Sequence, residues 1–358
     1  MHAKKEYIEE RNKESMKKVL YIATTADKRN RLDGETIKCR LLKEYLEEIE
    51  DIKILSVDTD NWKKHIIKLV FLILINFLKC DTIIVSSADN GAHIVLNFFR
   101  KIKTKKNIYY FVIGGSLAKN IKEKKWNINS YNNLEHIYAE SNILKEELNK
   151  LNINNVDVLN NFRKVSNFNN QYEKSETVKF VYFGRVIKEK GVEEAIKLIK
   201  RLNKENYNCT LDIYGQCKKT YLEIIQKEFD QNIKYNGEIK PDNKTEYEIL
   251  SQYDIFIFPT EYPGECLPGA LIDCYIAGLA VIASNWKYAK EYIEENENGK
   301  IFEYQNYEDM YKKTLELLSE NNLEKYKLKS KELSKKYNLD DLLVDFKKKL
   351  LEAGNENS

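Results

Sequence analysis

The chain has 358 residues, of which 42% are hydrophobic and 32% charged, and its net charge is +3 at pH 7. This length is sufficient for two domains that each bury their own core. The near balance of charge argues against a dedicated nucleic-acid binder, so no nucleic-acid partner is expected.

The charge is unevenly divided along the chain. Residues 1–170 contain 30 Lys+Arg and 22 Asp+Glu, whereas the remainder contains 29 and 34. A basic first half can attract anionic lipid or an acidic substrate. It can equally reflect a general use of lysine on surfaces, and composition leaves both interpretations open.

Short apolar runs alternate with helical patterns over the first 160 residues. The runs are continuously apolar, which is typical of parallel strands covered on both faces. After the second predicted strand, residues 65–80 ("HIIKLVFLILINFLKC") form the most apolar window of the chain. The predicted strands cover residues 17–24, 52–57, 81–87, 107–115, 136–141 and 155–161.

The apolar window at residues 65–80 does not predict a membrane span. Lys68 and Asn76 interrupt it, which leaves fewer than the roughly 18–20 apolar residues that a span needs. A buried or interface-docked helix is one interpretation, and a shallow membrane-surface helix is the other.

The start of the chain and its cysteines predict a cytoplasmic protein. Residues 1–16 are expected to be a tail, and "MHAKKEYIEERNKES" has no apolar core of a signal peptide. None of the six cysteines forms a CxxC pair, so they are expected to be reduced thiols.

A polar, Asn-rich stretch without periodicity separates two series of strands and helices and predicts a linker. In the second series, strands are expected at residues 178–184, 209–215, 233–239, 254–260 and 279–284, with helices between them. The predicted α/β fold is therefore two doubly wound, Rossmann-like domains facing across a cleft. The expected boundaries are a first domain at 1–160, a linker at 161–177, a second domain at 178–337, and a helix and tail at 338–358.

Two loops in the second domain contain candidate ligand-binding residues. In "GRVIKEKG", Gly184 permits close backbone approach, while Arg185 and Lys190 precede a new helix. An Arg and a Lys beside a helix N-terminus suit a diphosphate, although such residues at a turn are often merely solvated.

The second loop is "FPTEYPGECLPGALIDCYIAG", from Phe258 to Gly278. Its prolines stiffen the loop, and Pro268 suits the first position of a helix. Glu265 lies on this loop, and Asp273 lies within the apolar helix that follows. Because an unpaired buried carboxylate is costly, Asp273 must have a partner or face a cleft.

These motifs together resemble glycosyltransferase family 4, a group of retaining enzymes with the GT-B fold. The resemblance covers residues 178–302 closely and the first domain more loosely. It rests on a G-R-x4-K-G turn at residues 184–191, and on an E-x7-E-like pair formed by Glu265 and Asp273, followed by "AGLAVIAS".

The resemblance implies roles for individual residues. Arg185 and Lys190 would hold the donor diphosphate, Glu265 would contact the donor sugar, and Asp273 would bond the ribose hydroxyls. Further donor-binding positions implied by the resemblance are Gly184, Cys266, Leu267, Pro268, Gly237, Glu238, Ile239 and Gly34.

The family implies a retaining transfer of a hexosyl or acetamido-hexosyl group from a nucleotide diphosphate sugar, with a UDP-sugar favoured. The acceptor would be a saccharide or lipid-linked saccharide in capsule or other surface polysaccharide assembly, with peripheral contact to the inner membrane face left open. No cofactor is expected. No DxD motif follows a strand in the site region, so metal-independent transfer is predicted. His93 is the nearest candidate for an acceptor-side histidine.

Two other interpretations remain open at this point. One is a non-catalytic GT-B subunit that binds sugar or partners a true transferase, although retention of Arg185, Lys190 and Glu265 argues against it. The other is a GT-B sugar-nucleotide epimerase.

Overall fold

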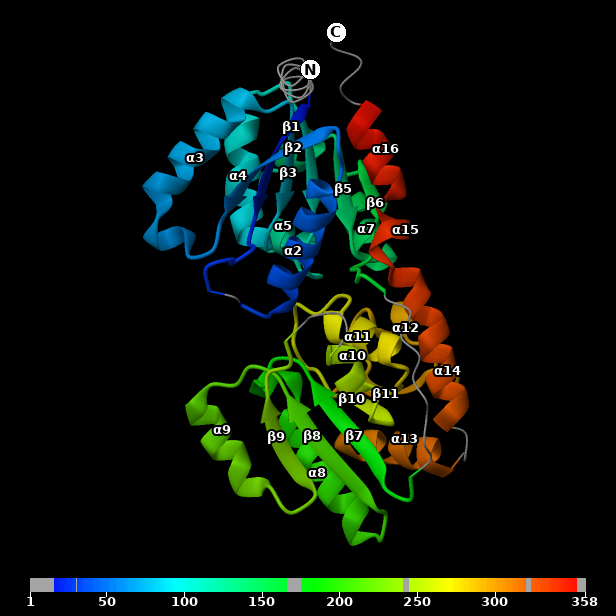
Figure 1. Cartoon of the computed structure of the whole chain (residues 1–358). Coiled ribbons are helices and arrows are strands. Elements are labelled where there is room, and N and C mark those ends of the chain that lie inside the picture. The colour runs from blue at the N-terminus through cyan, green and yellow to red at the C-terminus, as the bar shows by residue number, and fades with distance from the viewer. Residues whose placement is uncertain (1–15, 30, 166–174, 241–244, 320–322, 353–358) are drawn as a thin grey trace, which may run out of the picture. The chain divides into compact units, whose positions relative to one another are not determined.

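The computed structural model describes residues 16–29, 31–165, 175–240, 245–319 and 323–352. The chain divides into two compact units, the first within residues 1–31, 35–159 and 340–358 and the second within 32–34 and 160–339 (Figure 1). Most of the predicted N-terminal tail (1–15) and part of the predicted linker (166–174) lie outside the described residues. Each unit is described by itself.

The first unit is built on a parallel sheet of six strands in the order β2-β1-β3-β4-β5-β6. Its first strand, β1 (Lys17–Ala23), pairs in parallel with both β2 (Ile52–Asp58) and β3 (Thr82–Ser86). Every residue of β3 is buried, as expected for a strand covered on both faces. The remaining strands are β4 (Asn107–Phe111), β5 (His136–Ala139) and β6 (Val156–Val158).

Helices connect the strands of the first unit. Helix α2 (Gly34–Glu47) packs its apolar face inward, with Leu42 and Leu46 fully buried. The other helical segments are η1 (Trp62–Lys64), α3 (Ile66–Lys79), α4 (Asp89–Lys101), α5 (Leu117–Glu123), α6 (Asn129–Asn132) and α7 (Asn142–Asn149).

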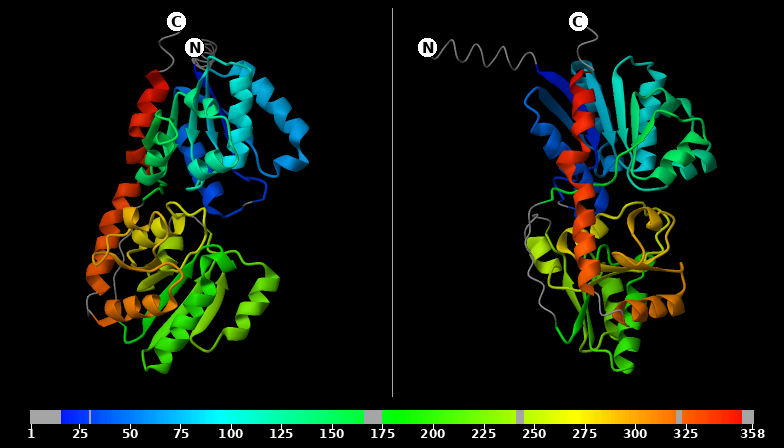
Figure 2. Two further views of the ribbon diagram at one scale, coloured as in Figure 1. Left: turned by 180° about the vertical axis from the view of Figure 1, so that it is seen from behind. Right: turned by 90° about the vertical axis from the view of Figure 1, so that its right-hand side faces the viewer.

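The end of the described chain packs on the first unit. The helix predicted within residues 338–358 is two helices, α15 (Leu339–Leu342) and α16 (Val344–Glu352). Phe346 of α16 meets the rings of Tyr109, Phe111 and Tyr138 edge-on, with centroids 5.5, 4.9 and 5.4 Å away. These contacts place α16, red in Figure 2, on the side of β4 and β5.

The second unit contains another parallel sheet of six strands, in the order β12-β11-β10-β7-β8-β9. Its strand β12 (Gly299–Phe302) had not been expected, because "GKIF" is short and contains a lysine. Lys300 is nevertheless buried, and it donates to Asn296. The other strands are β7 (Val178–Phe183), β8 (Cys209–Tyr214), β9 (Ile233–Gly237), β10 (Ile255–Phe258) and β11 (Ala280–Ser284).

Helices again separate the strands of this unit. Helix α8 (Val192–Lys204) has six buried apolar residues on one face, and α11 (Gly269–Ala277) is almost wholly buried. The other helical segments are η2 (Lys188–Lys190), α9 (Lys219–Ile225), η3 (Gln226–Glu228), α10 (Thr245–Leu250), α12 (Ala289–Tyr292), α13 (Tyr307–Ser319), α14 (Leu323–Ser334) and η4 (Lys335–Tyr337). The predicted α/β class with two doubly wound parallel sheets is confirmed.

Candidate active site

Three glycines mark the carboxyl ends of adjacent strands in the second unit. Gly184 follows β7, Gly215 follows β8, and Gly237 ends β9. All three have positive φ angles. Ligands of open α/β sheets bind at this edge, so the candidate site begins here.

The backbone strands approach each other closely at these glycines. A Cβ atom at Gly215 would lie 1.7 Å from the carbonyl oxygen of Gly184, which no side chain could tolerate. By contrast, a Cβ at Gly184 or Gly237 would meet no atom within 4 Å. The backbone at Gly215 is therefore in close contact with that at Gly184, whereas the space that a side chain at Gly184 or Gly237 would occupy is empty of protein atoms.

The loop after β7 is held against the loop after β10. The amide of Glu261 donates to the carbonyl of Glu189 over 2.8 Å. A Cβ at Gly191 would lie 2.0 Å from the carbonyl oxygen of Pro259, and the positive φ of Gly191 also favours glycine there. This contact brings the two predicted ligand-binding loops together.

Lys190 and Glu265 form a buried ion pair between these loops. Their side chains are 10% and 11% exposed, and the Thr260 hydroxyl lies 3.4 Å from the same carboxylate oxygen. Burial lowers the pKa of Lys190, and the Glu265 carboxylate opposes this shift by favouring the charged form. The sequence-predicted lysine and glutamate are thus direct partners.

Arg185 lies in the same cluster. Its guanidinium lies 5.1 Å from the centroid of the Tyr262 ring, and the Lys190 ammonium lies 5.0 Å from the same centroid. The Tyr182 hydroxyl donates to the Arg185 carbonyl over 2.9 Å, which fixes the backbone at this turn. Two cations therefore lie close to one aromatic ring at the carboxyl end of the sheet.

The segment leading into α11 is fixed through its carbonyl groups. The Trp286 indole donates to the carbonyl of Cys266 over 3.0 Å, and the Asn161 amide donates to that of Leu267 over 3.1 Å. Cys266 and Leu267 are buried. Pro268 is the N-cap of α11, one residue before the predicted position.

Asp273 has a partner that the sequence analysis missed. Arg163 donates to both of its carboxylate oxygens, over 2.6 and 3.1 Å, and both side chains are about 5% exposed or less. Although burial opposes it, the Asp273 carboxylate raises the pKa of Arg163. Because both oxygens are engaged, ribose binding by Asp273 stays a prediction that would require this pair to rearrange.

The remaining residues that were predicted to bind the donor sugar nucleotide lie after β9 and at the start of α2. Glu238 is exposed and Ile239 is buried, directly after β9 and Gly237. Gly34 is exposed and is the first residue of α2. Their predicted roles in donor binding stay predictions.

His93 lies in an aromatic cluster of the first unit. Its ring stacks on Trp126 with centroids 4.2 Å apart, and its Nδ1 lies 3.1 Å from the Tyr131 hydroxyl. Burial lowers its pKa, so the neutral imidazole is favoured near neutral pH. These contacts give His93 a packing role, and an acceptor-side role stays a prediction.

Asp89 is a further candidate that the sequence analysis did not identify. It begins α4 after strand β3, and its Oδ2 accepts from the Asn120 amide over 2.7 Å. Its Oδ1 is buried and has no hydrogen-bond partner among the described residues. Burial raises the pKa of Asp89 to about 6.

Asp89→Asn should stabilise the protein at pH 7.5 by up to about 3 kcal/mol, because the charged form is disfavoured on folding. The folded-state pKa is raised, so the folded protein holds more protons than the unfolded chain between about pH 4 and 6, and its stability falls as pH rises through that window. The gain should therefore shrink at pH 4.5. Urea unfolding of both proteins at the two pH values, with exposed Asp51→Asn as control, measures it. A loss of stability at both values would contradict the prediction.

Comparison with known proteins identifies the family. Residues 164–343 match the family described as glycosyl transferases group 1. The chain belongs to this family. The matched residues include the three glycines at the strand ends, Arg185 in the loop after β7, and the Lys190–Glu265 pair.

Curated relatives match over part of their length. A poly(ribitol-phosphate) alpha-N-acetylglucosaminyltransferase of Staphylococcus aureus (strain COL) is 24% identical over 202 residues, which are 55% of this chain and 40% of the relative. An uncharacterized 41.2 kDa protein in the cps region of Klebsiella pneumoniae is 24% identical over 268 residues, covering 68% of this chain and 71% of the relative. The chain thus spans less than half of the first relative.

Solved structures show the same fold. The Anabaena protein HepE, crystallised with UDP, has a TM-score of 0.71 and 11% identity, and the match covers 94% of this chain and 100% of HepE. At this identity the likeness concerns the fold alone, and it confirms the GT-B class. Among the described residues, no helix has both the length and the apolarity needed to cross a bilayer.

Proposed function

We propose that this glycosyltransferase is a retaining, family 4 enzyme that transfers a hexosyl or acetamido-hexosyl group from a UDP-sugar. The observation that carries the proposal is the Lys190–Glu265 pair, with Arg185 beside it, at the carboxyl edge of the second sheet. The E-x7-E-like spacing and the G-R-x4-K-G turn support the family 4 assignment.

The chemistry of the cluster fits the departure of a nucleotide diphosphate. Breaking the bond between a sugar and a diphosphate builds negative charge on the leaving phosphate. Arg185 and Lys190 would stabilise that charge, and positioned cations contribute most where water is excluded. Because two cations are already present, we propose that transfer needs no resident metal.

Glu265 would serve two purposes. It holds the Lys190 ammonium in place within the buried pair, and its carboxylate would accept hydrogen bonds from the donor sugar's hydroxyls. The open space at Gly184 and Gly237 would let the donor approach the backbone at the sheet edge. The first relative's name specifies transfer of N-acetylglucosamine, which supports an acetamido-hexose as one donor to test.

The acceptor would be a saccharide or lipid-linked saccharide in the assembly of capsule or another surface polysaccharide, on the cytoplasmic side of the membrane. The Klebsiella pneumoniae relative is described as lying in a cps region, which supports this class of pathway.

UDP should stabilise the protein more than GDP or CMP does. A nucleotide at a hundred times its dissociation constant adds about 2.7 kcal/mol to the free energy of unfolding. Thermal unfolding of the wild type, Arg185→Ala and Lys188→Ala with each nucleotide measures this. Lys188 is an exposed lysine of the same loop and serves as the matched control.

The expected result is stabilisation of the wild type and Lys188→Ala by UDP, with a much smaller shift for Arg185→Ala. Stabilisation by GDP alone would overturn the UDP assignment. If no nucleotide stabilises the wild type, the transferase proposal fails. The stereochemistry of the sugar product, read by NMR from a reaction with UDP-N-acetylglucosamine, would test retention.

A further inference from the structure

Helix α3 exposes an apolar surface that the proposed chemistry does not use. Seven of its large apolar side chains are more than one-third exposed: Ile66, Ile67, Val70, Phe71, Leu72, Leu74 and Leu78. Only Ile73 of this helix is buried. Contiguous exposed apolar surface of this kind marks a site of contact with another molecule or a membrane.

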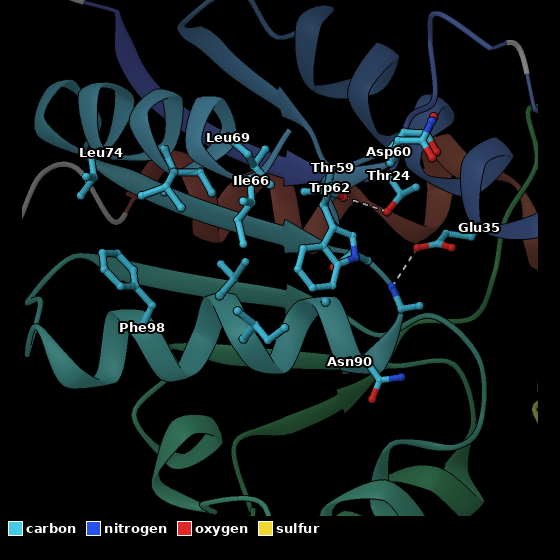
Figure 3. A pocket seen from close by; sticks show the side chains of 18 of the residues that line it. Thr24, Glu35, Thr59, Asp60, Trp62, Ile66, Leu69, Leu74, Asn90 and Phe98 are labelled. Atoms are coloured by element: carbon cyan, nitrogen blue, oxygen red, sulfur yellow. Dashed lines mark hydrogen bonds between the residues drawn. The ribbon is translucent and has the colours of Figure 1, made fainter. Parts of the chain in front are cut away.

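A groove runs between α3 and α4. Its volume is about 380 Å³, within the range of pockets that bind small molecules. Leu69, Ile73 and Leu74 form the wall from α3. Ile94, Val95 and Phe98 form the facing wall from α4 (Figure 3). These walls consist of apolar side chains, which a hydrocarbon chain prefers to water.

One end of the groove is polar. Thr24, Thr59 and Ser87, which line it, follow β1, β2 and β3 at the carboxyl edge of the sheet. Figure 3 shows Thr24, Thr59 and Asn90 at this end, Leu74 and Phe98 at the other, and Trp62 between them. The groove therefore suits a molecule with a hydroxyl-rich head and an apolar tail, with the head at the edge where α/β sheets bind ligands.

The two segments that form the apolar walls of the groove are basic in sequence, whereas Glu35 and Asp60 line the groove. No Asp or Glu occurs in residues 61–80 or 90–122. Both segments carry exposed lysines: Lys63, Lys64, Lys68, Lys79, Lys101, Lys103 and Lys105. Lysines near an anionic bilayer surface attract it. An apolar helix bordered by lysines is typical of a helix that lies in the membrane interface.

The N-terminal segment of the chain is a poor match for the groove. Residues 1–15 contain only Met1, Ala3, Tyr7 and Ile8 as apolar residues. They cannot supply an apolar face comparable with the surface of α3, so an external apolar occupant fits better.

We propose that the α3–α4 groove binds the hydrocarbon chain of a glycolipid in an anionic membrane, while α3 lies at the membrane surface. The identification of this glycolipid as the acceptor rests on the proposed function. The binding site itself rests on the groove, its polar end and the lysines of the two segments that form its walls. Ile67, Phe71 and Leu78 do not line the groove, and they would enter the membrane interface.

Dodecyl maltoside, below the concentration at which it forms micelles, is a suitable probe, and maltose is its chain-free control. Dodecyl maltoside should change the fluorescence of Trp62 saturably, and maltose should not. Subtracting the response of Trp62→Phe isolates this signal from Trp126 and Trp286. Val95→Phe, which fills the groove, and Ile94→Gln, which makes its wall polar, should each weaken binding about tenfold or more. Leu328→Gln, at an exposed apolar position of the second unit, should bind as the wild type does.

Co-sedimentation with vesicles tests the membrane surface of α3. The wild type should bind vesicles of phosphatidylcholine and phosphatidylglycerol, and binding should fall at high salt or without the anionic lipid. Ile67→Gln combined with Leu78→Gln should reduce vesicle binding while leaving UDP stabilisation unchanged.

The outcomes separate this inference from the proposed function. If dodecyl maltoside binds as described but no nucleotide stabilises the protein, the lipid site stands and the transferase proposal fails. If UDP stabilises the protein but Trp62 does not respond and vesicles are not bound, the lipid proposal is overturned and an amphipathic helix of a partner protein becomes the better occupant. Equal binding by the wild type, Val95→Phe and Ile94→Gln would also overturn it, because the chain would then lie elsewhere.

Discussion

Arg185→Ala should lower kcat for sugar transfer by about 10²- to 10³-fold, the usual effect of removing one group that stabilises transition-state charge. Arg185 shares the Tyr262 ring with Lys190 at the carboxyl edge of the second sheet, where the leaving diphosphate would lie. The ion pair between Lys190 and Glu265 stays intact when Arg185 is removed, so Glu265 keeps its counter-charge. The change should therefore affect turnover far more than folding. Steady-state kinetics with the donor that stabilises the wild type, together with thermal unfolding, measure both effects.

Lys188→Ala is the matched control for this experiment, because it removes one positive charge from the same loop at an exposed position. It should retain near wild-type kcat. Arg185→Lys should recover part of the activity, since lysine keeps the charge but loses the planar pair of donors. A wild-type kcat in Arg185→Ala would show that the leaving group is stabilised elsewhere.

Arg163→Ala should destabilise the protein by about 3–5 kcal/mol, because it leaves a buried carboxylate without its counter-charge. Arg163 donates to both oxygens of Asp273, and the Tyr247 hydroxyl lies 3.5 Å from one of them. Both side chains of the pair are about 5% exposed or less, so water cannot readily replace the lost counter-charge. Urea unfolding at pH 7.5 measures the loss.

The double variant Arg163→Met/Asp273→Leu should be much closer in stability to the wild type than Arg163→Ala, because it removes the Asp273 carboxylate together with its counter-charge. Asp273→Ala alone should be destabilising for the same reason, so it cannot serve as a clean test of ribose binding. If Arg163→Ala unfolds like the wild type, the ion pair contributes little. A double variant as unstable as Arg163→Ala would instead indicate that packing at this site matters more than charge.

Most of the fold was predictable from local patterns. Strands such as β3 and β10 are short, continuously apolar runs that are buried throughout, and this pattern needs no knowledge of the rest of the chain. The strand β12 was not predictable in the same way, because its lysine is buried only through contacts made by the folded chain. The position of α16 on the first unit was equally hidden, since an amphipathic pattern does not say which surface it covers.

The candidate site was predictable in its residue types but not in its partnerships. Motif spacing identified Arg185, Lys190 and Glu265, and the structure brings the last two into direct contact. Arg163 gave no local signal, because it lies in a polar, aperiodic segment 110 residues from its partner Asp273. Asp89 was also missed, since its raised pKa arises from burial that only the packed structure creates.

The sequence by itself determined the alternation of strands and helices, the two-sheet α/β class and the positions of the two loops that contain the candidate site residues. These features depend on residues close to one another in the chain, where periodicity and turn chemistry operate. Only the tertiary structure decided which charges are paired and which apolar faces stay uncovered. Lys38 and Glu140, for example, are joined over 2.6 Å in the core of the first unit, while α3 keeps its apolar face exposed. Pairing and coverage depend on which distant segments meet, because burial and Coulomb attraction act through space and not along the chain.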